Sequence, residues 1–183
     1  MQQELKELFN YLESNNYPTL TELQVSFLKS LGLILVGSAS LEMHCSQYVL
    51  AHLNNVLKLD LNIDWELFVS IVSQSVDNGE IPFYFNLPDT YSAPQIALYF
   101  SDCGVLEETN HPYYYFTHMG MVVRIPGQDK PVVLSKMDHC PLFIHDAQND
   151  AIMRFYSNKG VSRYGGVLYV NVEDVVRCIK TNI

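Results

Sequence analysis

The amino-acid sequence predicts a single α+β domain in which N-terminal helices pack on a C-terminal antiparallel sheet. Up to about residue 100, apolar residues mostly recur at the three- and four-residue spacing of amphipathic helices. After Gly104, aromatic and β-branched runs are separated by short turns, as is typical of strands and hairpins. The 183 residues are enough to bury one core without disulfides or metals.

Composition excludes several classes of protein. Hydrophobic residues make up 48% of the chain and charged residues 17%, which indicates a globular rather than a disordered chain. A net charge of -9 leaves no basic surface for a nucleic-acid backbone, so we expect no nucleic-acid partner. The first residues lack a secretory signal pattern, and no apolar run reaches the roughly 20 residues of a membrane span. We therefore expect a cytoplasmic protein without a membrane span.

The helical part is predicted from periodicity and from capping residues. Leu33 to Val36 form a short apolar run between two of these helices, and residues 81–85 form a short strand. We treat residues 64–104 as a helical insert that would wall one side of a site. The predicted helices cover residues 3–15, 19–32, 45–57, 64–79 and 94–100.

The sheet part is predicted from strand propensity and turn residues. Residues 126–131 contain two prolines, a glycine and an aspartate, which favour a turn between two paired strands. Asn171 is expected to cap a final helix. The predicted strands cover residues 113–125, 132–135, 142–144 and 166–170.

Cys45 is predicted to begin the third helix. Cys45, Val49, Leu53 and Val56 follow one helical face, so the sulfur should lie on the face that packs into the core. At a helix N-terminus the positive end of the helix dipole stabilises a thiolate, which is the reactive form of cysteine. The alternative is that Cys45 is a small buried apolar residue, as most free cysteines are.

His118 lies near the start of a predicted strand and is the candidate base. If Pro126 pairs with Pro131, His118 lies opposite His139, and Ser135 shares its face. A neighbouring polar group is needed to hold the imidazole in one tautomer, and His139 is best placed for this role. Asp138 takes the place of His139 if a bulge shifts the register by one residue.

Two short segments resemble the NlpC/P60 superfamily of papain-like hydrolases. They are Cys45-Ser46-Gln47-Tyr48-Val49 and His118-Met119-Gly120-Met121-Val122, which match a Cys-Ser-x-x-Val helix start and a Ser/Thr-His-Val-Gly-Ile strand. The resemblance implies a papain-like fold with Cys45 as nucleophile, His118 as base and His139 as the group that orients the base. It also implies cleavage of amide bonds in peptides of the peptidoglycan type or, as in some branches of the superfamily, acyl chemistry on lipids or proteins.

The predicted function is that of a cysteine hydrolase that attacks an amide bond with Cys45 and uses His118 as base. The alternative is a catalytically inactive binding or structural protein of a larger assembly. We expect neither a cofactor nor a metal, because the ligand-type residues match no known zinc spacing. Those residues are His118, His139, Cys140, His145 and Asp146.

Overall fold

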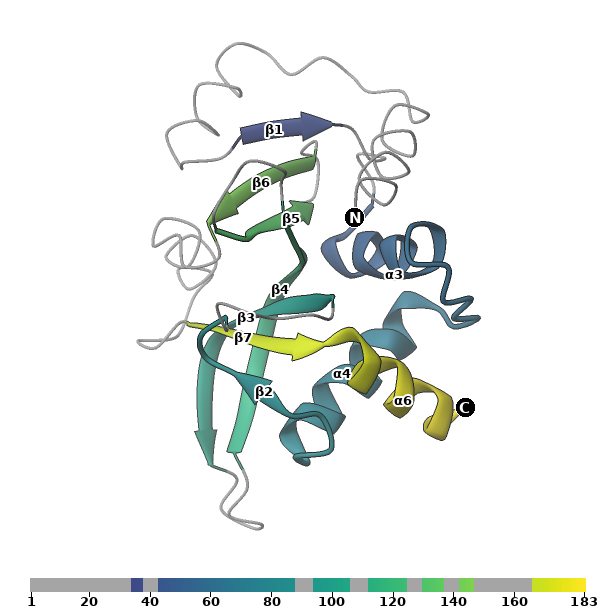
Figure 1. Ribbon diagram of the computed structural model, residues 1–183. Helices are drawn as coiled ribbons and strands as arrows, with labels where there is room; N and C mark the ends of the chain where they lie inside the picture. Colours follow the sequence, from purple (N-terminus) through teal and green to yellow (C-terminus); the bar gives the residue numbers. More distant parts are fainter. Residues whose placement is uncertain are drawn as a thin grey trace.

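The computed structural model describes residues 43–87, 94–105, 112–124, 130–136, 142–146 and 166–183, and the backbone of residues 34–37 (Figure 1). For residues 102, 103, 105 and 112 it likewise describes the backbone alone. The elements, in chain order, are β1 (Ile34–Gly37), α3 (Cys45–Asn55), α4 (Trp65–Asp77), β2 (Phe83–Tyr84), β3 (Gln95–Val105), β4 (Pro112–Val123), β5 (Val132–Lys136), β6 (Leu142–Asp146), β7 (Gly166–Asn171) and α6 (Val172–Asn182).

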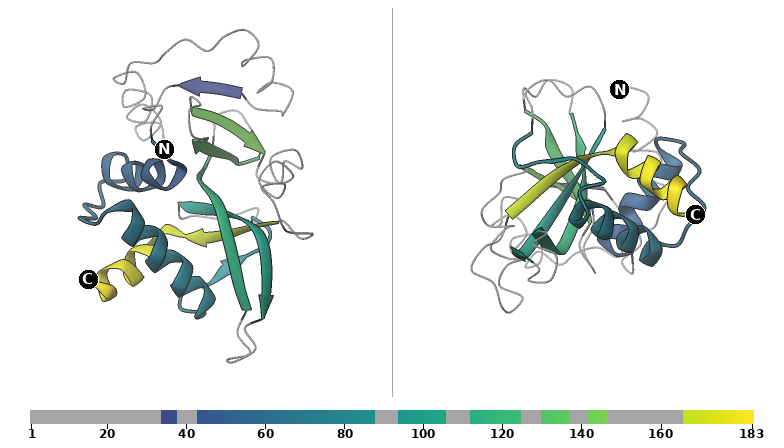
Figure 2. Two further views of the ribbon diagram at one scale, coloured as in Figure 1. Left: turned by 180° about the vertical axis from the view of Figure 1, so that it is seen from behind. Right: turned by 90° about the horizontal axis from the view of Figure 1, so that it is seen from below.

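The strands form one antiparallel sheet in the order β1-β6-β5-β4-β3-β7-β2. Strands β3 to β6 follow one another as a meander, and β7 returns from the C-terminal part to pair with β3. Helices α3, α4 and α6 lie together on one side of the sheet (Figure 2). This arrangement confirms the predicted α+β class.

Local sequence explains where the helices begin and end. The side chain of Gln47 accepts a hydrogen bond of 2.8 Å from the backbone N–H of His44, which fixes the start of α3 at Cys45. The carboxylate of Asp64 accepts a 2.7 Å bond from the Leu67 N–H and caps α4. Gly79, just beyond the end of α4, adopts the left-handed conformation with φ of 74° that favours glycine. These boundaries match the predicted ones.

The main hydrophobic core lies between the helices and the sheet. Every second strand residue faces it, because side chains alternate between the two faces of a strand. The strand residues of this helix-side core are Ile96, Leu98, Phe100, Met119, Met121, Val132, Leu134, Leu142, Ile144, Leu168 and Val170. The opposite face of the sheet carries a second set of buried side chains: Ala97, Tyr99, Val122, Val133, Phe143, Val167 and Tyr169.

Two bulges interrupt the ladder between β3 and β4. Thr117 of β4 and Ser101 of β3 are each an extra residue without an opposing residue in the ladder. Because Thr117 is inserted, Phe116 and Met119 both pack against the helix-side core although three positions separate them. From Met119 onward β4 pairs regularly with β3, so successive side chains of β4 point to opposite faces of the sheet there.

The predicted helix over residues 94–100 is wrong, because residues 95–100 lie on β3. The side chains of Ile96 and Leu98 face the helices, whereas Ala97 and Tyr99 are buried on the other face. A strand buried on both faces is apolar throughout, and periodicity alone does not separate it from a buried helix. The segment predicted as a helical insert over residues 64–104 is helical only in α4, because its later part forms β2 and most of β3.

The register predicted for the β4–β5 hairpin is wrong by two residues. The ladder joins Gly120 to Ser135 and Val123 to Val132, so its register does not place Pro126 opposite Pro131. A two-residue slip keeps every side chain on its predicted face. Ser135 therefore still shares a face with His118, as predicted. The helices predicted over residues 3–15 and 19–32 lie outside the described residues.

Candidate functional site

Cys45 is the first residue of α3, as the sequence predicted. Its side chain is partly buried and packs against the helix-side core, along the face that Val49 and Leu53 continue. A thiol at this position meets the electropositive end of the helix, which favours the thiolate. The structure thus places Cys45 at a helix N-terminus, on the helix side of the sheet.

His118 faces the other side of the sheet. Met119, the next residue on β4, packs against the helix-side core, and successive strand residues point to opposite faces. The His118 ring instead lies 5.5 Å from the ring of Tyr99, centroid to centroid, among the side chains of the opposite face. The structure therefore does not bring His118 to the helix side, where Cys45 packs. The catalytic roles of Cys45 and His118 remain predictions.

The His118 ring belongs to a chain of buried hydrogen bonds that crosses three strands. Its Nε2 atom lies 3.1 Å from the Oγ atom of Ser135 on β5, and the same Oγ lies 3.0 Å from Nε2 of His145 on β6. The Nδ1 atom of His145 is 2.6 Å from the backbone carbonyl oxygen of Asp146. We call His118, Ser135 and His145 the His–Ser–His chain.

The direction of each bond in this chain follows from the last acceptor. A carbonyl oxygen only accepts, so Nδ1 of His145 carries the proton and its Nε2 is the acceptor in the neutral ring. The Ser135 hydroxyl then donates to His145 and accepts from Nε2–H of His118. Neutral His118 therefore has its proton on Nε2, which leaves Nδ1 unprotonated.

Burial surrounds the His–Ser–His chain and keeps its His145 ring neutral at physiological pH. His118 and His145 are each 3% exposed and Ser135 is fully buried. Loss of solvent lowers the pKa of His145 to about 4, and the nearby Asp146 carbonyl and carboxylate oppose this shift only in part. The rings of Tyr99 and Phe143 enclose His145 at centroid distances of 5.9 and 5.7 Å. Such an environment favours a structural network over a solvent-accessible base.

Gly120 makes room for this chain. A Cβ atom at position 120 would lie 2.7 Å from the Oγ atom of Ser135 and 2.8 Å from the backbone oxygen of Leu134. Neither approach is compatible with an ordinary side chain, and the backbone oxygen has little freedom to move. The absence of a side chain at Gly120 therefore allows β4 and β5 to bring His118 and Ser135 into contact.

His139, predicted as the group that orients the base, and its alternative Asp138 both lie outside the described residues. The register that placed His139 opposite His118 is wrong, and within the described residues the group bonded to the His118 ring is Ser135. Sequence reasoning placed Ser135 on the correct face but assigned it no role. It considered His145 only as a metal ligand, although its place within the apolar run of β6 indicated a buried side chain.

A second buried histidine lies on α3 itself. His52 is 4% exposed, and its Nδ1 atom lies 3.3 Å from the hydroxyl oxygen of Tyr48 one helical turn earlier. Desolvation lowers the pKa of His52 to about 4. His52 is therefore neutral at physiological pH, and its ring packs edge-on against Tyr48, a residue of the helix-side core.

Within the described part of the chain, no three metal-ligating side chains come together, and no helix is long and apolar enough to cross a membrane.

Comparison with known proteins found no matching family model, no matching curated protein and no matching solved structure.

Proposed function

We propose that this chain is a binding or structural protein with a papain-like arrangement of helices and sheet, and that it does not use Cys45 and His118 as a catalytic pair. One observation carries the proposal: Met119 packs against the helix-side core, so His118 points to the face on which Ser135 and His145 lie. A general base must come within about 3 Å of the proton it removes, directly or through one water.

Burial of the imidazole supports the same conclusion. His118 is 3% exposed and its Nε2–H is bonded to Ser135, so neither a substrate nor its leaving group has open access to the ring. Buried and fully bonded polar chains fix the register of neighbouring strands. We assign the His–Ser–His chain this role of holding β4, β5 and β6 in register. The resemblance in the two short segments makes peptides of the peptidoglycan type the first ligands to test for binding.

The second candidate is a cysteine hydrolase that cleaves an amide bond, with Cys45 as nucleophile, His118 as base and His139 as the orienting group. The observation that favours it is the position of Cys45 at the first residue of α3, partly rather than completely buried. It requires that His118 and Cys45 meet in a conformation different from the one described above.

Alkylation kinetics separate the two candidates. The rate of iodoacetamide labelling at Cys45 is measured from pH 5 to 10 by peptide-resolved mass spectrometry, in the wild type and in His118→Ala. Our proposal predicts the same pH midpoint in both proteins, because His118 does not face the sulfur. A thiolate–imidazolium pair would label Cys45 below pH 7, and His118→Ala would move the midpoint upward by one unit or more.

Two controls complete this experiment. His145→Ala disturbs the same buried chain without removing the candidate base, so a shift seen in both histidine variants reflects structural change. Cleavage of muramyl peptides by the wild type and by Cys45→Ala is followed in parallel. Cleavage that depends on Cys45 would refute the proposal and favour the hydrolase.

A further inference from the structure

Gln95, at the start of β3, carries a buried oxygen atom for which the described residues supply no hydrogen-bond partner. The residue is 1% exposed, and its Nε2 atom donates a 3.1 Å bond to Oδ1 of Asn171. Its Oε1 atom is buried without a donor. An amide flip would reverse this assignment only if Asn171 could present a donor to Gln95.

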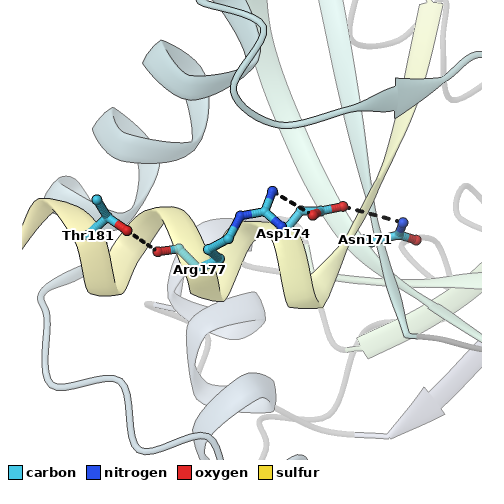
Figure 3. Close-up of polar contacts among 4 residues, drawn as sticks. All are labelled: Asn171, Asp174, Arg177 and Thr181. Atoms are coloured by element: carbon cyan, nitrogen blue, oxygen red, sulfur yellow. Dashed lines mark hydrogen bonds and ion pairs between the residues drawn. The ribbon is translucent and has the colours of Figure 1, made fainter.

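The N-terminus of α6 prevents that flip. The Nδ2 atom of Asn171 is directed at Oδ2 of Asp174 at 3.5 Å, and a carboxylate only accepts. Asp174 is itself fixed by a 2.7 Å ion pair with Arg177 (Figure 3). Asn171 therefore presents its oxygen to Gln95, so Gln95 presents its Nε2 to Asn171 and its Oε1 elsewhere. The polar series Arg177–Asp174–Asn171–Gln95 thus ends on an acceptor atom.

Tyr169 of β7, the strand that pairs with β3, carries a second such atom. It is 1% exposed, and among the described residues nothing bonds to its hydroxyl group. Gln95 pairs with Asn171 and Ala97 pairs with Tyr169, so Gln95 and Tyr169 are diagonal neighbours on the same face. Long side chains reach one another across this diagonal.

One small polar molecule could form hydrogen bonds with both atoms. Gln95 offers an acceptor, and Tyr169 offers a donor, because burial raises the pKa of its hydroxyl far above its ordinary value. Tyr99, on the same face, is close enough that Tyr169 raises its pKa. Unbonded buried polar atoms are costly, and proteins commonly satisfy them with an internal water that makes two to four bonds.

We propose that one internal water molecule binds between Gln95 and Tyr169, donating to Oε1 of Gln95 and accepting from the Tyr169 hydroxyl. This water would extend the polar series from the surface pair of α6 into the sheet. It would thereby tie the start of α6 to β3 and β7 on the side opposite the helix-side core.

The variant Tyr169→Phe tests the proposal because it removes the hydroxyl and retains the ring. If a water bridges the two residues, the variant removes the hydrogen bond that the water accepts from the hydroxyl. The urea midpoint of unfolding then falls below that of the wild type. If the hydroxyl has no partner, removing it relieves an unfavourable burial, and the midpoint is unchanged or rises. Tyr115→Phe removes a hydroxyl from a ring that is 66% exposed and should leave the midpoint unchanged.

A crystal structure at high resolution tests the occupant directly. We expect one water-sized peak within 3.2 Å of both Oε1 of Gln95 and the Tyr169 oxygen. No peak, or density for a larger molecule, would overturn the proposal, as would an unchanged or higher midpoint for Tyr169→Phe.

Discussion

Acidification should destabilise this protein well before its carboxylates titrate, because His52 and His145 are buried in the neutral form. In the folded state burial lowers each pKa to about 4, from about 6.5 in the unfolded chain. The unfolded chain therefore binds protons that the folded chain does not. The stability supplied by these groups is complete above pH 6.5 and is lost progressively as pH falls from there toward 4.

The two pKa shifts set the size of the effect. At pH 5 each histidine lowers the free energy of unfolding by about 2 kcal/mol, and together by about 4 kcal/mol. The same values imply that unfolding near pH 5.5 takes up almost two protons. Asp77 acts in the opposite direction, since partial burial raises the pKa of its carboxyl group.

Urea unfolding at several pH values between 7.5 and 5 measures this loss, and the slope of stability against pH counts the protons. His52→Gln and His145→Gln should each reduce the slope at pH 5.5 by about one proton. A free energy of unfolding that is constant between pH 7 and 5 would refute the reasoning. It would mean that these rings are solvated, or that they keep compensating partners when charged.

Three substitutions test the local structure by urea unfolding at pH 7.5. Gly120→Ala should lower stability by about 1–3 kcal/mol, because its Cβ meets a backbone oxygen; an unchanged midpoint would show that β4 and β5 can separate there. Ser135→Ala leaves two buried imidazoles without their shared partner and should cost about 1–3 kcal/mol, whereas Ser135→Thr retains the hydroxyl and should recover part of the loss. Asp64→Ala removes the cap of α4 and should cost about 1 kcal/mol, with Asp64→Asn close to wild type.

Helix ends were predictable because single residues with local roles mark them. Asp64 accepts from the helix it begins, Gly79 adopts a conformation that favours glycine, and Asn171 directly precedes α6. These effects act within a few residues, so no knowledge of the rest of the fold is needed. β3 was not predictable in this way, because burial on both of its faces removes the alternation that identifies a strand.

The hairpin register and the facing of His118 depend on information that the local sequence lacks. A slip of two residues leaves every side chain on the same face, so the apolar pattern supports both registers equally. On β4 Met119 and Met121 face the helices, while Gly120 and Val122 face the other side. Since both sets are apolar, the sequence does not indicate which set the helices cover, and the side of His118 followed only from the structure.

Burial of the sheet on both faces has a consequence for how this sequence can diverge. In a sheet with one solvated face, the solvent-facing positions of each strand accept many different polar residues. Homologues of such a protein keep the alternating apolar pattern and differ mainly at those positions. At the centre of β3 and β7 both sets are enclosed, and a polar replacement at either Leu98 or Tyr99 would have to find a buried partner. A buried polar residue on any strand of this sheet therefore needs a polar partner on a neighbouring strand, as His118, Ser135 and His145 on β4, β5 and β6 illustrate. Variation that needs no such pairing is left to exposed positions such as Tyr115 and the outer face of α6.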